Sequence, residues 1–429
     1  MMATAPSYFR STDFDFALPE SLIAQQPAPE RDQSRLMLLQ KDALSHHQFS
    51  ALPELIEQVV GQGTLLVLND TRVLPARLRA RKLHPGSGEL GGQVELLLCE
   101  PVHAPGTAQP EVSGTAQHWR CMYRASKAMR PGMRLLLLRR PGSELATEAA
   151  GVTVDAGDLP VATVLSNEGD GYVTVALPAA SEAELLTLLT QLGEVPLPPY
   201  IHREAAASAV LESGTDSRRE VDRQRYQTVY AQVPGSVAAP TAGLHFTPQV
   251  LAALSARGIE QARVTLHVGP GTFLPMRTDD PSQHVMHAER YHVPPETAAA
   301  IARAKAEGRK VLAVGTTVVR TLESATPEGQ HVPQSGWGET QLFIYPRGPG
   351  APQHTFKVVD ALLTNFHLPR STLLMLVAAL AGRQRVLAAY AQAVAQSYRF
   401  FSFGDAMLIP SQLPDPECAP ASTRESERP

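Results

Sequence analysis

Cysteine is scarce in this chain of 429 residues, which contains only Cys99, Cys121 and Cys418. Their spacing fits neither a tetrahedral zinc site nor a disulfide framework, and so few thiols suit the reducing cytoplasm. Residues 1–15 lack the basic segment and apolar run of a secretory signal. The longest apolar run, residues 373–381, is too short to cross a bilayer. We therefore expect a cytoplasmic protein without a membrane-spanning segment.

An excess of positive charge is also absent. The chain has 38 Lys and Arg residues against 42 Asp and Glu residues, which gives a net charge of −4. Proteins that bind nucleic acid through their overall charge are basic, so any contact with RNA must come from a local patch. The basic candidates are Arg72, Arg77, Arg79, Arg81 and Lys82, which follow a strand end, and the run Arg218, Arg219, Arg223 and Arg225, although charge runs are usually solvated faces.

The pattern of apolar residues divides the chain into zones. A buried-type strand is predicted at 64–68, and residues 74–190 contain short strand-like runs between Pro/Gly-rich stretches, which is typical of a barrel or sandwich. After residue 190, strands alternate with helices, and such crossover connections indicate a mixed or parallel sheet. The helix that begins at Thr247-Pro248 has a favourable N-cap and first turn.

We therefore predict an α/β fold whose mixed-sheet main domain is built from both ends of the chain, residues 1–73 and 191–410. An all-β, barrel-like domain of residues 74–190 is inserted into it. The tail, residues 411–429, is rich in Pro, Ser and Glu, and is expected to be disordered.

The segment 235–247 is the densest in small residues, which let a ligand approach the backbone closely. It includes Thr241 and Gly243 and leads into a helix N-terminus, where free amides favour an anion. His245 can move a proton near neutral pH. A tight connection with a core histidine explains this pattern equally well.

Segment 265–273 ends a strand at His267 and then turns through Gly269, Gly271 and Thr272. It lacks the third glycine of a dinucleotide-binding loop, and the pattern alone favours a simple turn. In segment 284–292, three histidines surround Glu289, but their spacing is not that of a zinc protease. We expect no metal there, and Glu289 remains a candidate general base or hydroxyl-binding group.

Segment 311–323 runs from a strand through a glycine turn into a helix N-terminus, which can cradle an anion. Capping alone would explain the two threonines, and a surface ion pair would explain Arg320 and Glu323. Segments 364–369 and 398–407 mix aromatic with polar residues, and aromatic faces can stack on unpaired bases. For Phe400, Phe401 and Phe403 a core position is favoured. The polar candidates are Thr316, Thr317, Arg320, Glu323, Asn365, His367 and Asp405.

Taken together, these motifs resemble those of one family, the S-adenosylmethionine:tRNA ribosyltransferase-isomerases of queuosine biosynthesis. The segments 235–247, 265–273, 284–292 and 311–323, and the pair 364–369 and 398–407, stand in the family's order. Further pieces of the chain also match the family. They are residues 18–20 with 23–25, 31–36, 68–73, 193–200 and 225–231. Departures are confined to segments that look like additions, namely 101–117, 141–160, 204–217, 328–338 and the tail.

The resemblance implies an activity. Enzymes of this family transfer and isomerise the ribosyl part of S-adenosylmethionine onto 7-aminomethyl-7-deazaguanine at the wobble position of tRNA. The product is epoxyqueuosine, and adenine and methionine are released. The expected partners are therefore S-adenosylmethionine as co-substrate and tRNA with a GUN anticodon. The resemblance further implies a monomer without a prosthetic group.

This chemistry needs at least one group that titrates near neutrality. The sulfonium makes the neighbouring 5′ carbon acidic, and protonation would assist the departure of adenine. We expect His245 or His267 as the base, with Glu289 and Asp405 as the acidic candidates. Thr316, Thr317, Arg320 and Glu323 are assigned to the methionine or ribose end. The side that faces tRNA is assigned Arg72, Tyr226 and Gln227, with Asn69, Asp70, Thr241, Gly243, Gly269, Gly271, Thr272, Asn365 and His367 as further substrate-binding candidates.

Two other classes of function compete with this interpretation. One is a metal-dependent hydrolase built on His284, His287 and His292. The other is an RNA-binding module without catalysis, which the weakly acidic charge disfavours.

Overall fold

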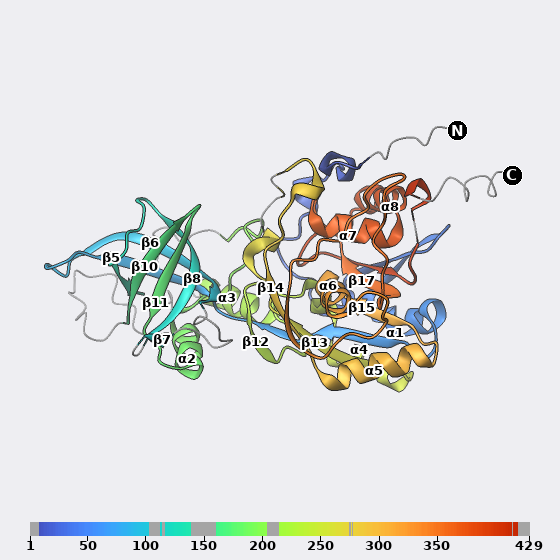
Figure 1. Cartoon of the computed structure of the whole chain (residues 1–429), viewed down its shortest axis with the longest axis horizontal. Helices are drawn as coiled ribbons and strands as arrows, with labels where there is room; N and C mark the ends of the chain where they lie inside the picture. The colour runs from blue at the N-terminus through green and yellow to red at the C-terminus, as the bar shows by residue number, and fades with distance from the viewer. Residues whose placement is uncertain are drawn as a thin grey trace.

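The structure is a computed structural model that describes residues 8–102, 112–113, 116–138, 160–203, 214–273, 276, 278–413 and 415–418. Within these ranges the side chains of 112–113, 214–219, 272–273 and 416 are not described. Figure 1 shows two lobes, a β-barrel on the left and a larger α/β lobe on the right.

The larger lobe is built on a nine-stranded sheet in the order β16-β14-β13-β3-β15-β17-β18-β1-β2. Both parallel and antiparallel pairs occur in it, so the sheet is mixed. Three strands come from the start of the chain and six from its second half. They are β1 (Arg35–Leu39), β2 (Leu44–Gln48), β3 (Leu65–Asn69), β13 (Glu260–Leu266), β14 (Glu289–Val293), β15 (Val311–Val314), β16 (Gly336–Thr340), β17 (Ala361–Asn365) and β18 (Ala406–Ile409).

Alternate side chains of the central strands enter two different cores. In β3, Leu65 and Val67 pack into one core while Leu66 and Leu68 pack into the other. Helices cover both faces, as near-continuous apolar strands require. The first face carries α5 (Pro295–Ala306), α6 (Thr316–Ala325), α7 (Thr372–Ala381) and α8 (Arg383–Ala395), and the second carries α1 (Leu52–Leu55) and α4 (Pro248–Ala256).

The smaller lobe is a closed barrel. Six strands pair antiparallel around the ring β11-β10-β9-β5-β6-β8, and β8 pairs back onto β11. These two sheets confirm the predicted fold class. The strands are β5 (Arg77–Leu83), β6 (Leu90–Pro101), β8 (Ala116–Ala125), β9 (Arg134–Leu137), β10 (Val161–Gly169) and β11 (Tyr172–Leu177), with the short β7 (Val112–Ser113) beside β8.

A helix joins this barrel, although the inserted segment was expected to contain strands only. Ser181 caps α2 (Glu182–Leu192) by accepting a hydrogen bond from the amide of Glu184. Its Leu185, Leu188 and Leu189 pack into the barrel core. The helix also extends past the predicted domain limit at residue 190.

The connection between the lobes runs through a small parallel sheet of β4 (Thr71–Val73) and β12 (Val233–Ser236). The helix α3 (Gly214–Arg225) precedes β12 along the chain. Next to this sheet, Arg77 and Glu194 pair through their backbones, and Arg79 contacts the Glu194 carboxylate at 3.1 Å.

Part of the predicted tail is packed. Asp415 caps α8 by accepting a hydrogen bond from the amide of Arg383 at 2.7 Å, and Leu413 is buried. These residues therefore differ from the disorder expected of them, while 419–429 lie outside the described residues. In the described part of the chain no single helix is long and apolar enough to cross a membrane, although α7 and α8 together pass that test despite a bend of 116°.

Candidate active site

Strand direction gathers the predicted site residues at one edge of the main sheet. Strands β13, β3, β15 and β17 are parallel neighbours, so their carboxyl ends share that edge. Asn365 at the end of β17 lies opposite Ala406 at the start of β18, which places Asp405 there as well. Leu36 also pairs with Ala406, and this adds Ser34. Ligands commonly bind at such an edge.

Asn69 holds this edge together. Its Nδ2 donates to the Leu266 carbonyl at 3.1 Å and to Thr317 Oγ1 at 3.3 Å, while its Oδ1 accepts from the amides of Leu266 and Thr71. The neighbouring Asp70 accepts a hydrogen bond from Thr265 Oγ1 at 2.7 Å, and burial raises its pKa. All these contacts are within the protein, so Asn69 and Asp70 position the strand ends.

His245 lies in the middle of a buried hydrogen-bonded chain. Its Nδ1 is 2.7 Å from Ser34 Oγ, and its Nε2 is 3.1 Å from Asn365 Oδ1. The amide nitrogen of Asn365 donates to the Phe401 carbonyl at 2.8 Å, so its oxygen faces His245 as an acceptor. His245 Nε2 therefore carries the proton, which leaves Nδ1 to accept from Ser34.

The surroundings of His245 keep its ring neutral. Burial lowers the pKa of His245 to about 4, although Asn365 and Asp405 act in the opposite direction. Its ring stacks on Phe49 at 5.0 Å, which fixes the plane of the imidazole. The imidazole is therefore neutral and oriented at neutral pH, and its pKa lies below the near-neutral value that we expected of the base.

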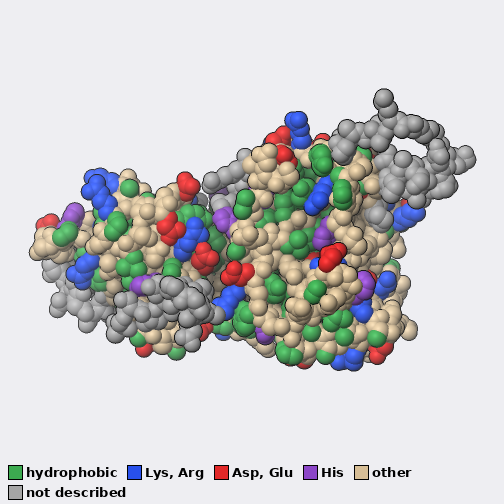
Figure 2. All heavy atoms as spheres, in the orientation of Figure 1, with side chains coloured by type: hydrophobic (Ala, Val, Ile, Leu, Met, Phe, Trp, Pro, Cys, Tyr) green, Lys and Arg blue, Asp and Glu red, His purple; other side chains and the backbone are tan. Residues whose placement is uncertain are grey.

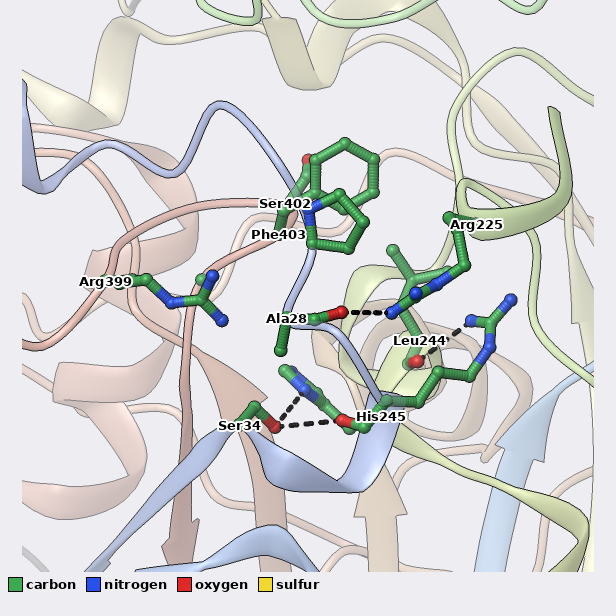
Figure 3. A pocket seen from close by; sticks show the side chains of 11 residues that line it. Ala28, Ser34, Arg225, Leu244, His245, Arg399, Ser402 and Phe403 are labelled. Carbon is green, nitrogen blue, oxygen red and sulfur yellow. Dashed lines mark hydrogen bonds between the residues drawn. The ribbon is translucent and has the colours of Figure 1, made fainter. Parts of the chain in front are cut away.

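A hollow next to His245 is lined by three arginines. Figure 3 shows Arg225 and Arg399 reaching toward it from opposite sides, with Ser34 and His245 below them in the view. The third is Arg31, whose pKa is lowered to about 10 by burial and by the charge of Arg225. Guanidinium groups that repel one another around a hollow suit an anionic ligand.

These arginines are held in place by backbone carbonyls. Arg31 donates to the carbonyls of Leu244 and Gln224, and Arg225 to those of Ala28 and Pro29. Arg399 donates to the Gln26 carbonyl at 3.3 Å. Carbonyls do not cancel positive charge, and of the three arginines only Arg399 also pairs with a described carboxylate, that of Asp405 at 3.8 Å. The hollow therefore keeps its attraction for an anion.

Asp405 is buried and paired with arginines. It accepts hydrogen bonds from the backbone amides of Arg35 and Arg399, at 2.9 and 2.8 Å. The Arg35 side chain approaches it to 3.2 Å. These contacts hold the loop before β18 against the start of β1.

His267 lies at the other end of the same edge. Three interstrand steps separate β17 from β13, which is roughly 14 Å. His267 Nδ1 is 2.9 Å from Thr71 Oγ1, and its Nε2 has no hydrogen-bond partner among the described residues. Burial lowers the pKa of His267 to about 4, and Arg290 acts in the same direction. The ring of Trp337 is stacked 6.0 Å away.

Glu289 and Arg320 form an ion pair with both side chains 5% exposed. Glu289 Oε1 also accepts from the Gly269 amide at 3.1 Å, which links the pair to the turn after His267. Arg320 donates through Nε to the Leu342 carbonyl at 3.0 Å. Its Nη2 is buried without a hydrogen-bond partner in the described structure, so it can still bind a ligand oxygen.

The remaining candidates near α6 and β17 have partners of their own. Thr316 is buried in the first turn of α6, while Thr317 accepts from Asn69. Glu323 accepts hydrogen bonds from the backbone amides of residues 357–359. Burial raises the pKa of Glu323, but these bonds and the contact with His354 together lower it by more, so the net shift is downward. Burial lowers the pKa of His367 to about 3, and its Nε2 lies 2.9 Å from Thr364 Oγ1.

Two of the candidate glycines, Gly243 and Gly271, have no room for a side chain. A Cβ at Gly243 would lie 2.2 Å from Tyr230 Oη, and one at Gly271 would lie 2.7 Å from the His287 ring. Each glycine therefore allows a close approach of another side chain. Thr241 opens the short 3₁₀ helix Thr241–His245 and is partly exposed, whereas the side chain of Thr272 lies outside the described residues.

The residues assigned to the tRNA side differ in exposure. Tyr226 is fully buried against Phe403, so in this conformation it supports the site from within. Gln227 binds both the amide and the carbonyl of Val73. Arg72 is exposed and forms no ion pair with a described residue. The side chains of Arg218 and Arg219 lie outside the described residues.

The histidines that suggested a metal site are separated. His284 packs on Phe343, His287 lies against Gly271, and His292 stacks on Trp337. Among the described residues no three His, Cys, Asp or Glu side chains form a group that could hold a metal ion. The hydrolase interpretation therefore loses the cluster on which it depended.

Sequence reasoning did not assign a role to Ser34, Arg31 or Arg399. Ser34 and Arg31 belong to the segment 31–36, which matched the family but carried no proposed function. Their importance comes from the pairing of β1 with β18, which brings residues about 370 positions apart into contact. On the face shown in Figure 2, acidic and basic side chains are interspersed, as the nearly balanced charge suggests.

Comparisons with known proteins agree with one another. A family model described as "Queuosine biosynthesis protein" matches residues 11–409. The S-adenosylmethionine:tRNA ribosyltransferase-isomerase of Anaeromyxobacter sp. (strain Fw109-5) is 49% identical over 401 residues, which cover 93% of this chain and 99% of the relative. The protein of the same name from Syntrophotalea carbinolica is 46% identical over 403 residues, with the same coverage. A crystal structure of S-adenosylmethionine tRNA ribosyltransferase from Thermotoga maritima is 33% identical over 92% of this chain and 99% of that one, with a TM-score of 0.45.

Proposed function

Because this chain belongs to the queuosine biosynthesis protein family, we propose that it acts as an S-adenosylmethionine:tRNA ribosyltransferase-isomerase. It transfers and isomerises the ribosyl group of S-adenosylmethionine onto 7-aminomethyl-7-deazaguanine at the wobble position of tRNA. The products are epoxyqueuosine-tRNA, adenine and methionine. Relatives that share nearly half of the residues over almost their whole length carry the name of this activity.

The observation that carries the mechanism is a pair of neutral histidines at one sheet edge. The reaction needs an acceptor for the proton of the 5′ carbon and a donor for the departing adenine. His245 is oriented by Ser34 and Asn365 and is the acceptor in this proposal. The Nε2 of His267 has no hydrogen-bond partner among the described residues. His267 follows β13, which lies roughly 14 Å from β17 across the sheet, a separation that a substrate pair as large as S-adenosylmethionine and a nucleotide can span.

The charged groups divide between anionic and polar parts of the substrates. The hollow with Arg31, Arg225 and Arg399 suits a carboxylate or a phosphate. The buried Arg320, with Thr316 and Thr317 at the helix N-terminus, suits the methionine or ribose end. Glu289 and Asp405 hold these groups in place and set the local charge. Exposed Arg72 faces the tRNA in this assignment, and Gln227 braces its strand.

We extend the proposal to the finer points that the family suggests. The preferred tRNAs carry a GUN anticodon, the protein acts as a monomer in the cytoplasm, and no prosthetic group takes part. S-adenosylmethionine is consumed as a substrate.

The test is to incubate the purified protein with S-adenosylmethionine and tRNA that carries the aminomethyl-deazaguanine. Adenine, methionine and an epoxide-bearing nucleoside are expected in equal amounts. If tRNA binds but neither adenine nor methionine is released, the protein is a binding module and the proposed function is wrong. If His245→Ala and His267→Ala each keep near-normal turnover at saturating substrates, the assignment of the base is wrong.

A further inference from the structure

A large aromatic side chain, that of Trp337, is exposed on the main lobe beside His267. Trp337 on β16 is 51% exposed. Of the three phenylalanines first considered for base stacking, Phe400 and Phe403 are buried and Phe401 is half-buried. Trp337 lies opposite His292 in the strand pair, and their rings stack at 4.8 Å with an angle of 27°. The indole is also stacked near His267, at 6.0 Å and 28°. The two imidazoles support the ring while half of its surface remains open to solvent.

Positive charge lies next to this indole. The guanidinium carbon of Arg290 is 4.5 Å from the centroid of the Trp337 ring. Arg72 is exposed beside Thr71, which contacts His267. Neither Arg290 nor Arg72 forms an ion pair with a described residue. Glu339 lies opposite Arg290 in the strand pair, but the two side chains do not form an ion pair. The surface around Trp337 thus combines a half-exposed indole, with the Arg290 guanidinium over its ring, and the exposed Arg72, which follows Thr71 in the chain.

We propose that Trp337 is a stacking platform for an unpaired nucleotide of the tRNA, whose phosphates are bound by Arg290 and Arg72. A π-face and adjacent cations are the features with which proteins bind single-stranded RNA without reading its sequence. This inference rests on the proposed function, because it names the surface that receives the tRNA substrate. The stacked nucleotide would lie directly beside His267.

The charges favour RNA over S-adenosylmethionine as the occupant. The adenosine end of S-adenosylmethionine has no anionic group for Arg290 or Arg72, and its sulfonium would be repelled by them. A nucleotide within RNA offers a base for the indole and a phosphate on either side for the arginines.

The tryptophan content of the chain provides a direct test. The chain has two tryptophans, and Trp119 is buried in the barrel with no hydrogen-bond partner for its Nε1 among the described residues. Trp119→Phe therefore breaks no known hydrogen bond and leaves Trp337 as the only tryptophan. We expect an anticodon stem-loop RNA to quench the fluorescence of this variant, and to leave that of Trp337→Phe, which retains Trp119, nearly unchanged.

Binding of the full tRNA gives a second measurement. Trp337→Ala is expected to weaken tRNA binding by between about 5-fold and 100-fold, and Trp337→Phe to restore most of the affinity. The KM for S-adenosylmethionine should stay within about twofold of the wild-type value, since that substrate does not use the platform. Tyr8→Ala is the matched control, because Tyr8 is an aromatic residue 62% exposed outside the site. Arg290→Ala should reduce the salt dependence of binding by about one phosphate contact.

The outcomes separate this inference from the proposed function. If Trp337→Ala binds tRNA normally while the wild type releases adenine, the platform is wrong and the enzymatic function stands. If S-adenosylmethionine alone quenches Trp337 and RNA does not, the platform holds adenine and the inference is overturned. If the wild type releases no adenine but RNA still quenches Trp337, the proposed function fails and the stacking surface is supported.

Discussion

His245 and His267 lie at the same sheet edge, and burial lowers the pKa of each to about 4, yet their hydrogen bonds differ. Both nitrogens of His245 are occupied, one by Ser34 and the other by Asn365. Within the described ranges, the His267 ring forms a hydrogen bond only through Nδ1, with Thr71. The two histidines therefore differ in how they can contact a substrate, although their pKa values are equal. A histidine with a free ring nitrogen can contact the substrate directly, whereas one whose two nitrogens are both hydrogen-bonded must act through a neighbour.

The surroundings of the two histidines differ as well. His245 adjoins a hollow lined by three arginines, whereas His267 lies beside a half-exposed tryptophan. Arginines around a hollow suit an anionic group, and an exposed aromatic side chain suits contact with a base of a nucleic acid. The two ends of the sheet edge therefore differ in what surrounds the histidine, an arginine-lined hollow at one and a half-exposed indole at the other.

The largest expected effect is that of His245→Gln. A harmless change would contradict the role of His245 as the histidine that accepts the proton. Glutamine can keep one hydrogen bond but cannot take up a proton, so kcat should fall by about 10²- to 10⁴-fold. Steady-state release of adenine measures the change. His331→Gln is the control, because His331 is exposed and its ring bonds to no described group other than the Lys357 carbonyl. Near-normal turnover in His245→Gln would assign the proton transfer to the His267 end instead.

Glu289→Ala tests the support of the His267 end. The change leaves Arg320 buried without its carboxylate and removes the acceptor of the Gly269 amide. Loss of one partner from a buried ion pair typically costs about 3–5 kcal/mol, which urea unfolding would measure. The matched change Glu57→Ala breaks the partly exposed pair with Arg257 and should cost less than about 1 kcal/mol. Equal costs for the two variants would mean that the Glu289–Arg320 pair is not a support.

Acid should weaken the fold through the buried histidines. The pKa of His245 is lowered in the folded state to about 4 from the ordinary value of 6.5. Between these values the unfolded chain binds the proton and the folded chain does not, so stability is full above about pH 6.5 and falls as the pH drops toward 4. One such group contributes about 3 kcal/mol. The free energy of unfolding of His245→Gln should therefore fall less over this range than that of His331→Gln, and identical pH profiles would contradict the lowered pKa.

Local patterns in the sequence predicted most of the α/β units, because caps and apolar spacing act over a few residues. Thr247, for example, caps α4 through the amide of Val250, as its position before Pro248 indicated. The helix α2 was missed, although Leu185, Leu188, Leu189 and Leu192 have helical spacing, because the surrounding segment was interpreted as strands only. The contact between Ser34 and His245 could not be predicted, since it depends on strand pairs between distant segments. The exposure of Trp337 likewise requires the folded surface.

The smallest expected effect is that of Ser34→Ala, and it sharpens the comparison most. If His245 acts through Ser34, removal of the hydroxyl leaves Nδ1 buried without a partner, and kcat should fall by about tenfold while the KM values change little. Ser34→Thr keeps a hydroxyl and should restore part of the rate, which a loss caused only by altered packing would not predict. Ser45→Ala is the matched control, because Ser45 also contacts a histidine, His47, at 2.8 Å but lies on the outer strand β2. Full activity in Ser34→Ala would mean that His245 orients the loop without taking part in proton transfer. His267, whose Nε2 has no partner in the described part of the chain, would then be the histidine that contacts the substrate.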